Sequence, residues 1–189
     1  MIVRQVTGPV AAPVTLAEIK AHCVVDFDDD DALLTSLGAA ASRSISAWSG
    51  RVLTTEVWSV SFAAGFCGDL VLPKSPVQSV DAITYFDADD VEQTASVADF
   101  YLTQGEDRAF LRPKAGVSWP SANSRRADAI TVQFTAGYAT GLDNLKTAVL
   151  AMTAHLYEHR EAVGDSALAE IPLGVAALIE PDKLGWVAA

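Results

Sequence analysis

The sequence contains few cysteines, and this limits the kinds of site it can build. Only Cys23 and Cys67 are present, about forty residues apart, and no C-x-x-C pair occurs. Zinc ribbons and redox motifs need closely spaced cysteine pairs, and small disulfide-stapled folds need several of them. We therefore expect two separate buried thiols and no structural disulfide.

Long apolar runs and an excess of basic residues are also missing. No run reaches the roughly 18 apolar residues of a membrane span, and the N-terminal stretch lacks the apolar core of a signal peptide. We expect a chain that folds in the cytoplasm where it is made, without a membrane partner. The 13 Lys and Arg face 24 Asp and Glu, which gives a net charge of −11. This balance excludes a protein that grips duplex DNA by neutralising its phosphates.

The apolar residues that are present follow two different periods. Half of the 189 residues are hydrophobic, which suits one domain or one core with an insertion. After an extended arm over residues 1–14, Thr15 and Glu18 form a capping box that predicts a helix to about residue 23. Carboxylates of the run 26–31 stabilise the start of a second helix over 29–49. A third helix is predicted over 143–162, with one or two helical turns at 172–179.

Between the second and third helices the period changes to that of strands. Strands are predicted at 52–62, 69–73, 78–86, 91–95, 99–103, 108–112 and 128–136, with a long loop at 113–127. We predict an α+β fold in which a small helical bundle carries a β-rich insertion and an apolar C-terminal tail. The expected division is 1–50 (arm and two helices), 51–140 (insertion), 141–165 (long helix) and 166–189 (tail).

One string has the pattern of a catalytic metal site. His155, Glu158 and His159 match H-x-x-E-H, in which two histidines bind zinc and the glutamate acts as base. A metal-dependent hydrolase is therefore an alternative function. The site would need a third protein ligand, and only thirty residues follow the string. We favour a helix with a polar edge, and we predict no catalytic, cofactor or metal site.

Charge is distributed unevenly along the insertion. Residues 75–107 hold eight acidic side chains and no basic one, whereas residues 108–126 hold five basic side chains and no acidic one. Opposite signs on one module suit head-to-tail contact between copies, and pairing within the monomer is the open alternative. The predicted contact residues are Asp87, Asp89, Asp90, Arg125 and Arg126.

The end of the chain carries a large apolar load without a regular pattern. An apolar terminus of this kind is rarely left in water, so it either folds back on its own helices or docks on a partner. The apolar residues are Ile171, Leu173, Val175, Leu178, Ile179, Leu184, Trp186 and Val187.

Several stretches, in this order, resemble one family. They are Val14–His22, Leu33-Leu34, Ser49–Arg51, Leu72-Pro73, Pro76–Val80, Ser118–Pro120, Phe134–Tyr138, Ala154–Glu158 and Ile171–Val175. Together they resemble the head–tail connector (adaptor) proteins of long-tailed phages and of phage-derived gene transfer agents. His159 departs from the family, in which Asn is common at that place.

The resemblance implies a structural protein without catalysis or cofactor, in a ring of about twelve copies. Its implied partners are further copies, the portal protein, which the tail would bind, and a stopper or other neck protein. DNA would pass through the ring without specific binding. The implied location is the neck of a virion or phage-like particle, after assembly in the host cytoplasm. A different neck component, such as a stopper or tail-completion protein, is a second alternative.

Overall fold

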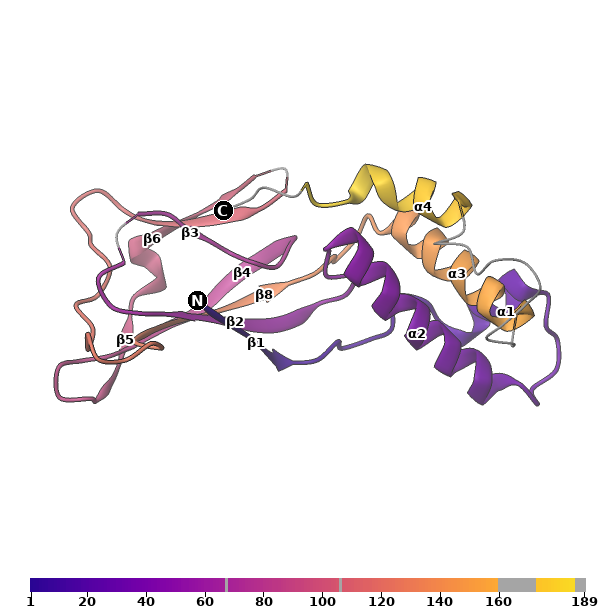
Figure 1. The fold of residues 1–189 in the computed structure, drawn as a ribbon, viewed down its shortest axis with the longest axis horizontal. Coiled ribbons are helices and arrows are strands. Elements are labelled where there is room, and N and C mark those ends of the chain that lie inside the picture. Colours follow the sequence, from indigo (N-terminus) through magenta and orange to yellow (C-terminus); the bar gives the residue numbers. More distant parts are fainter. Residues whose placement is uncertain (67, 106, 160–172, 186–189) are drawn as a thin grey trace. The chain divides into compact units, whose positions relative to one another are not determined.

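The chain forms two compact units, which we describe separately. The computed structural model describes residues 1–66, 68–105, 107–159 and 173–185 (Figure 1). The β unit consists of Met1–Val10 and Thr54–Ala139, and the helical unit of Ala11–Leu53 and Thr140–Ala189. The predicted α+β fold is confirmed.

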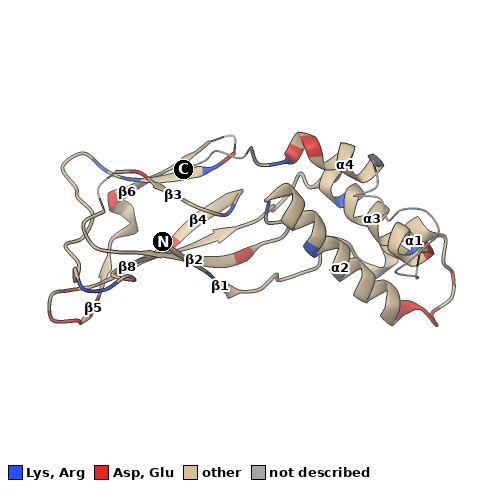
Figure 2. Cartoon of the chain, viewed as in Figure 1, with Lys and Arg blue, Asp and Glu red and all other residues tan. Residues whose placement is uncertain are grey.

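Four α-helices build the described part of the helical unit. They are α1 (Leu16–Cys23), α2 (Asp31–Ser49), α3 (Asp143–Glu158) and α4 (Leu173–Ile179), and the 3-10 turn η2 (Glu180–Asp182) follows. The starts of the first and third helices agree with the sequence prediction, whereas α2 begins two residues later than predicted. The acidic run lies in front of α2 (Figure 2). Residues 160–162 of the predicted third helix lie outside the described residues.

The ends of α1 and α2 show why these helices begin and stop where they do. Thr15 accepts a hydrogen bond from the backbone N–H of Glu18, and the Glu18 carboxylate accepts one from the backbone N–H of Thr15. This is the predicted capping box. Both helices end in a left-handed residue, Gly50 after α2 and, less commonly for a β-branched side chain, Val24 after α1 with φ 56°.

The core of the helical unit lies where α2 packs against α3. Leu34 and Ile45 of α2, and Leu145 and Val149 of α3, are buried. Gly38 lets α1 approach closely, because a Cβ there would lie 2.6 Å from Ile19 Cδ1. These apolar stripes have the helical spacing seen in the sequence.

Two antiparallel sheets make up the described part of the β unit. The five-stranded sheet has the order β1 (Ile2–Thr7), β2 (Glu56–Phe62), β8 (Ile130–Ala136), β4 (Val77–Phe86), β5 (Glu92–Ala95). The three-stranded sheet has the order β3 (Leu70–Val71), β7 (Ala109–Pro113), β6 (Phe100–Gln104), and the 3-10 turn η1 (Val97–Asp99) precedes β6.

The two faces of the five-stranded sheet differ in chemistry. One face carries the buried apolar side chains of β2 and β8, among them Val60, Val132 and Phe134. The other face carries mainly hydroxyl and amide side chains. One row of it runs across all five strands and consists of Ile2, Ser61, Thr131, Thr84 and Thr94.

The N-terminal residues belong to this sheet. The sequence predicts an extended arm over 1–14, and residues 2–7 of it are strand β1, paired with β2. The region 114–129 contains no strand, as the predicted loop implies. Only glycine fits at position 137, directly after β8, because a Cβ there would lie 2.0 Å from the carbonyl oxygen of Thr54. No helix within the described residues is long and apolar enough to cross a membrane.

Candidate interaction surfaces

The acidic turn between β4 and β5 is held together by Asp87. Its carboxylate accepts hydrogen bonds from the backbone N–H groups of Asp89 and Val91, and from Gln93 Nε2. The Gln93 hydrogen bond and then the Val91 N–H lower the pKa of Asp87. Asp87 therefore shapes the turn, and both of its oxygens are used within one copy.

Arg126 neutralises part of the acidic turn within the monomer. Its Nη1 lies 3.0 Å from Asp90 Oδ1, and its Nε lies 3.1 Å from Asp128 Oδ1. The guanidinium also stacks over the Phe86 ring, with 3.6 Å from Cζ to the ring centroid. The hydrogen bonds to Asp128 and Asp90 raise the pKa of Arg126, and Arg126 lowers that of Asp128.

The five predicted contact residues thus fall into two groups. Asp87, Asp90 and Arg126 have partners inside the monomer, which is the alternative that the sequence left open for this charge pattern. Asp89 and Arg125 are exposed, and within the described residues their charged groups have no ion-pair partner. Figure 2 shows charges of both signs at this β5 end of the sheet. Asp89 and Arg125 are the pair that remains available to another chain.

An aromatic cluster in the β unit organises the Trp-Pro loop. Trp119 meets Phe62 and Phe66 edge to face and Phe100 at a tilted angle, with ring centroids 4.8–5.6 Å apart. Its indole N–H donates a hydrogen bond of 2.9 Å to the Gly68 carbonyl oxygen. These contacts fix an otherwise irregular loop. The sequence marked Trp119 only through the family resemblance, because its partners lie far along the chain.

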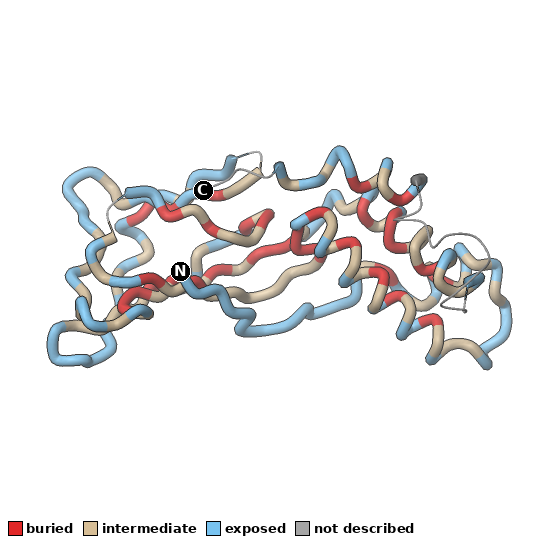
Figure 3. Tube along the Cα trace, viewed as in Figure 1, coloured by how far each residue is buried: buried red, intermediate tan, exposed pale blue. Residues whose placement is uncertain are grey.

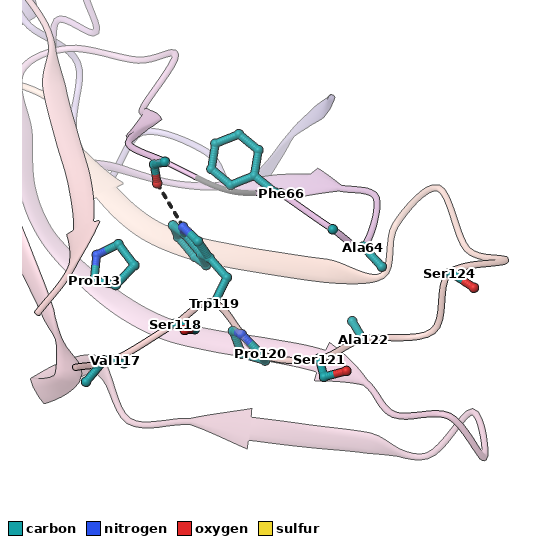
Figure 4. A pocket seen from close by; sticks show the side chains of 12 residues that line it. Ala64, Phe66, Pro113, Val117, Ser118, Trp119, Pro120, Ser121, Ala122 and Ser124 are labelled. Atoms are coloured by element: carbon teal, nitrogen blue, oxygen red, sulfur yellow. Dashed lines mark hydrogen bonds between the residues drawn. The ribbon is translucent and has the colours of Figure 1, made fainter. Parts of the chain in front are cut away.

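The same loop borders an open pocket of about 500 Å³. Residues 64–66, 68, 113, 117–122 and 124 line it, and the Trp119 ring is part of this lining (Figure 4). The lining consists of glycine, alanine, serine, proline, valine and aromatic residues, without a charged side chain. Among the described residues, the lining offers no acid, base or metal ligand.

The predicted portal-binding residues divide between core and surface. Val175 and Ile179 of α4 are buried in the helical unit, where α4 packs on α3, whereas Leu178 is half-buried. Leu184 packs against Gly50, and its backbone N–H donates to the Ser49 carbonyl oxygen at 2.8 Å. Arg51 Nε donates to the Asp182 carbonyl oxygen at 2.8 Å. Part of the tail therefore folds back on its own helices.

The remaining tail residues cannot be placed in this way. Ile171, Trp186 and Val187 lie outside the described residues, as does the side chain of Leu173. The contact of the tail with a portal therefore stays a prediction.

The H-x-x-E-H string lies at the end of α3. His155, Glu158 and His159 are exposed, and the two imidazole rings contact each other with centroids 4.6 Å apart. Within the described residues, no three His, Cys, Asp or Glu side chains gather into a group that could hold a metal ion. The geometry does not favour the hydrolase alternative.

The fold and the comparisons with known proteins indicate a structural protein. The model of the phage gp6-like head-tail connector proteins matches residues 13–99. Over these residues the chain is similar to this connector family, and the comparisons support a structural role. No curated protein sequence matches the chain significantly.

Three solved structures share the fold along the whole chain. All three come from gene transfer agent (GTA) particles, and each match covers 100% of this chain and 98% of the other chain. A chain in the neck of an empty particle, computed with C6 symmetry, has 24% identity and a TM-score of 0.80. A chain in the virion of a native particle has 27% identity and 0.80. A chain in the neck of a native particle, computed with C12 symmetry, has 26% identity and 0.77.

Proposed function

We propose that this chain forms a ring in the neck of a tailed-phage or phage-derived particle, where it joins the portal to the next neck protein. The observation that carries the proposal is the full-length fold shared with GTA neck chains, together with the connector family match over residues 13–99. The ring assembles in the host cytoplasm and performs no catalysis.

The symmetry of the related necks supports the proposed number of copies. A neck structure with C12 symmetry supports about twelve copies in heterologous, head-to-tail contact. The acidic turn supplies the negative side of this contact, because Asp89 has no charged partner in its own copy among the described residues. Arg125 is available to a neighbouring copy or to another neck protein.

The end of the chain supplies the portal contact. Val175 and Ile179 contribute indirectly, since they hold α4 on α3. Many weak tails on one ring give tight attachment through avidity. The residues proposed to touch the portal are Ile171, Leu173, Leu178, Leu184, Trp186 and Val187.

Position within a particle tests the function directly. We expect a reconstruction of purified particles to show this chain as a ring between the portal and the next neck protein, with DNA in the channel. Particles made with the chain deleted should contain filled or empty heads without attached tails. Density for the chain in the capsid shell or the distal tail, or normal tails without the chain, would contradict the proposal.

A further inference from the structure

The five-stranded sheet ends in two strands that are each paired on one side. β1 pairs with β2, and β5 pairs with β4. In the described part of the β unit, no strand lies against the other edge of either. Such edges present rows of backbone N–H and C=O groups that can pair with another chain.

The β1 edge has few of the features that usually prevent such pairing: Arg4 is its one charged residue, and its pairing with β2 is irregular between Gln5 and Thr7. It contains neither proline nor lysine, and all six of its residues are exposed (Figure 3). The exposed fractions of Ile2, Val3 and Val6 are 37%, 37% and 53%. Val3 lies on the same face as buried Val60, yet the core does not cover it. A strand added beyond β1 would bury this apolar surface.

The two edges run in the same direction. All four strand pairings between β1 and β5 are antiparallel, so each step across the sheet reverses the chain. Four reversals return the starting direction, and β5 is therefore parallel to β1. A copy placed beside the sheet without inversion brings its β1 alongside β5 as a parallel strand.

Opposite charges lie on one face at the two edges. Arg4 pairs across with Ser59, and this places it on the hydroxyl face. Glu92 lies on the same face, two residues before Thr94. Strands are spaced by about 4.8 Å, so four steps put the two edges about 19 Å apart within one copy. Arg4 and Glu92 cannot pair inside the monomer. Arg4 lies two residues after the row that holds Ile2 and Thr94, and Glu92 lies two residues before it, so they approach each other between copies when β1 of the neighbour is shifted by four residues along β5.

We infer that β1 of one copy pairs in parallel with β5 of the next copy, so that the sheet continues from subunit to subunit. The inference rests on the ring proposed above. In a ring of twelve, neighbours are related by 360°/12 = 30°, and so small a rotation cannot reverse a strand. This matches the shared direction of the two edges. The contact buries Ile2 and Val3 and brings Arg4 to the acidic start of β5.

Proline substitutions can block one edge without breaking the sheet. Successive residues of a strand point their N–H groups alternately toward the two sides, and proline removes the N–H. Of Ile2→Pro and Val3→Pro, one therefore weakens the β1–β2 pairing and the other blocks only the free edge. Thr94→Pro and Ala95→Pro form the same matched pair at β5. The thermal midpoint of the monomer identifies the edge-blocking member of each pair.

Native mass measurement of the variants then tests the contact. We expect each edge-blocking variant alone to stay monomeric at concentrations where the wild type forms rings. An equal mixture of the β1-blocked and β5-blocked variants should form heterodimers and no rings, because one intact β5 edge meets one intact β1 edge.

Several results would overturn the inference. Rings formed by either edge-blocking variant, a mixture that stays monomeric, or a wild-type chain that does not self-associate would each do so, since edge pairing between copies needs no third protein. The proposed function would be refuted by a different result, namely a particle reconstruction that places the chain outside the neck. If the chain forms a ring in the neck and the edge-blocking variants still assemble into rings, the edge contact is refuted and the proposed function is not.

Discussion

Glu18 connects two elements of the helical unit. Its carboxylate caps α1 at Thr15, and it also accepts a hydrogen bond of 2.5 Å from Lys146 Nζ of α3. The Lys146 contact, followed by those with Thr15, lowers the pKa of Glu18 from 4.5 to about 2. The folded chain therefore favours the ionised carboxylate, although the side chain is 39% exposed and water screens the ion pair.

The sign of this pKa shift determines a pH dependence. A lowered folded-state pKa stabilises the fold above the unfolded value of 4.5, and this contribution disappears as the pH falls toward 2. We expect Glu18→Gln to lower the free energy of unfolding by about 1 kcal/mol at neutral pH. The difference from the wild type should shrink as the pH falls below 4.5 and vanish only below about pH 2.

Urea unfolding followed by far-ultraviolet circular dichroism, at a series of pH values, measures this effect. Asp89→Asn is the matched control, because Asp89 has no ion-pair partner among the described residues. A difference between Glu18→Gln and the wild type that persists unchanged at low pH would argue against the contribution of the charge.

At the scale of elements, local signals in the sequence predicted more than distant ones. The capping box and the stop at Gly50 were predictable because the interacting residues are neighbours in sequence. The pairing of β1 with β2 was not, because an extended arm carries no mark of its partner some fifty residues later. The Arg126–Asp90 pair spans 36 residues, and only the fold brings it together.

The short helix α4 in the tail is another element whose packing partner could not be predicted from the sequence. The spacing of Val175 and Ile179 places them on one face of a helix, but it does not reveal what that face contacts. The structure packs α4 on α3 and ties the following turn to α2 through Ser49 and Arg51. Removing residues 171–189 should therefore damage the monomer as well as any portal contact.

Two adjacent residues of α4 separate these effects. Ile179→Ala removes a buried side chain and should lower the free energy of unfolding by about 2–5 kcal/mol. Leu178 is half-buried, and Leu178→Ala should cost less than about 1.5 kcal/mol while reducing portal binding. Chemical denaturation of both variants is the measurement. Equal losses of stability would mean that α4 does not pack on its Val175–Ile179 face.

At the scale of the whole molecule, acidic charge is in excess. The net charge of −11 repels phosphates at close range, and salt screens this repulsion beyond about 8 Å. A ring around the genome would then surround DNA without gripping it. The ion pairs within the β unit do not change this sum, because they only redistribute charges that are already counted.

The isolated protein should accordingly not bind duplex DNA. Fluorescence anisotropy with a labelled duplex at physiological salt should show a dissociation constant weaker than about 100 μM. Lowering the salt should not strengthen binding, because a protein with an acidic surface releases few counterions from DNA. Micromolar affinity that rises as salt is removed would show a basic DNA-binding surface that outweighs the net charge.

The insertion of the β unit between α2 and α3 also sets the order of events during synthesis. Residues 54–139, which follow α2 and precede α3, number 86. At about 5–20 residues per second, the ribosome needs about 4–17 s to produce them. During that time Leu34 and Ile45 of α2 lack their packing partners Leu145 and Val149, and the five-stranded sheet can close only at its end, when its central strand β8 has been made. The strands of the inserted unit are thus synthesised before α3, and the α2 surface that packs against α3 stays exposed to aggregation until α3 has been made.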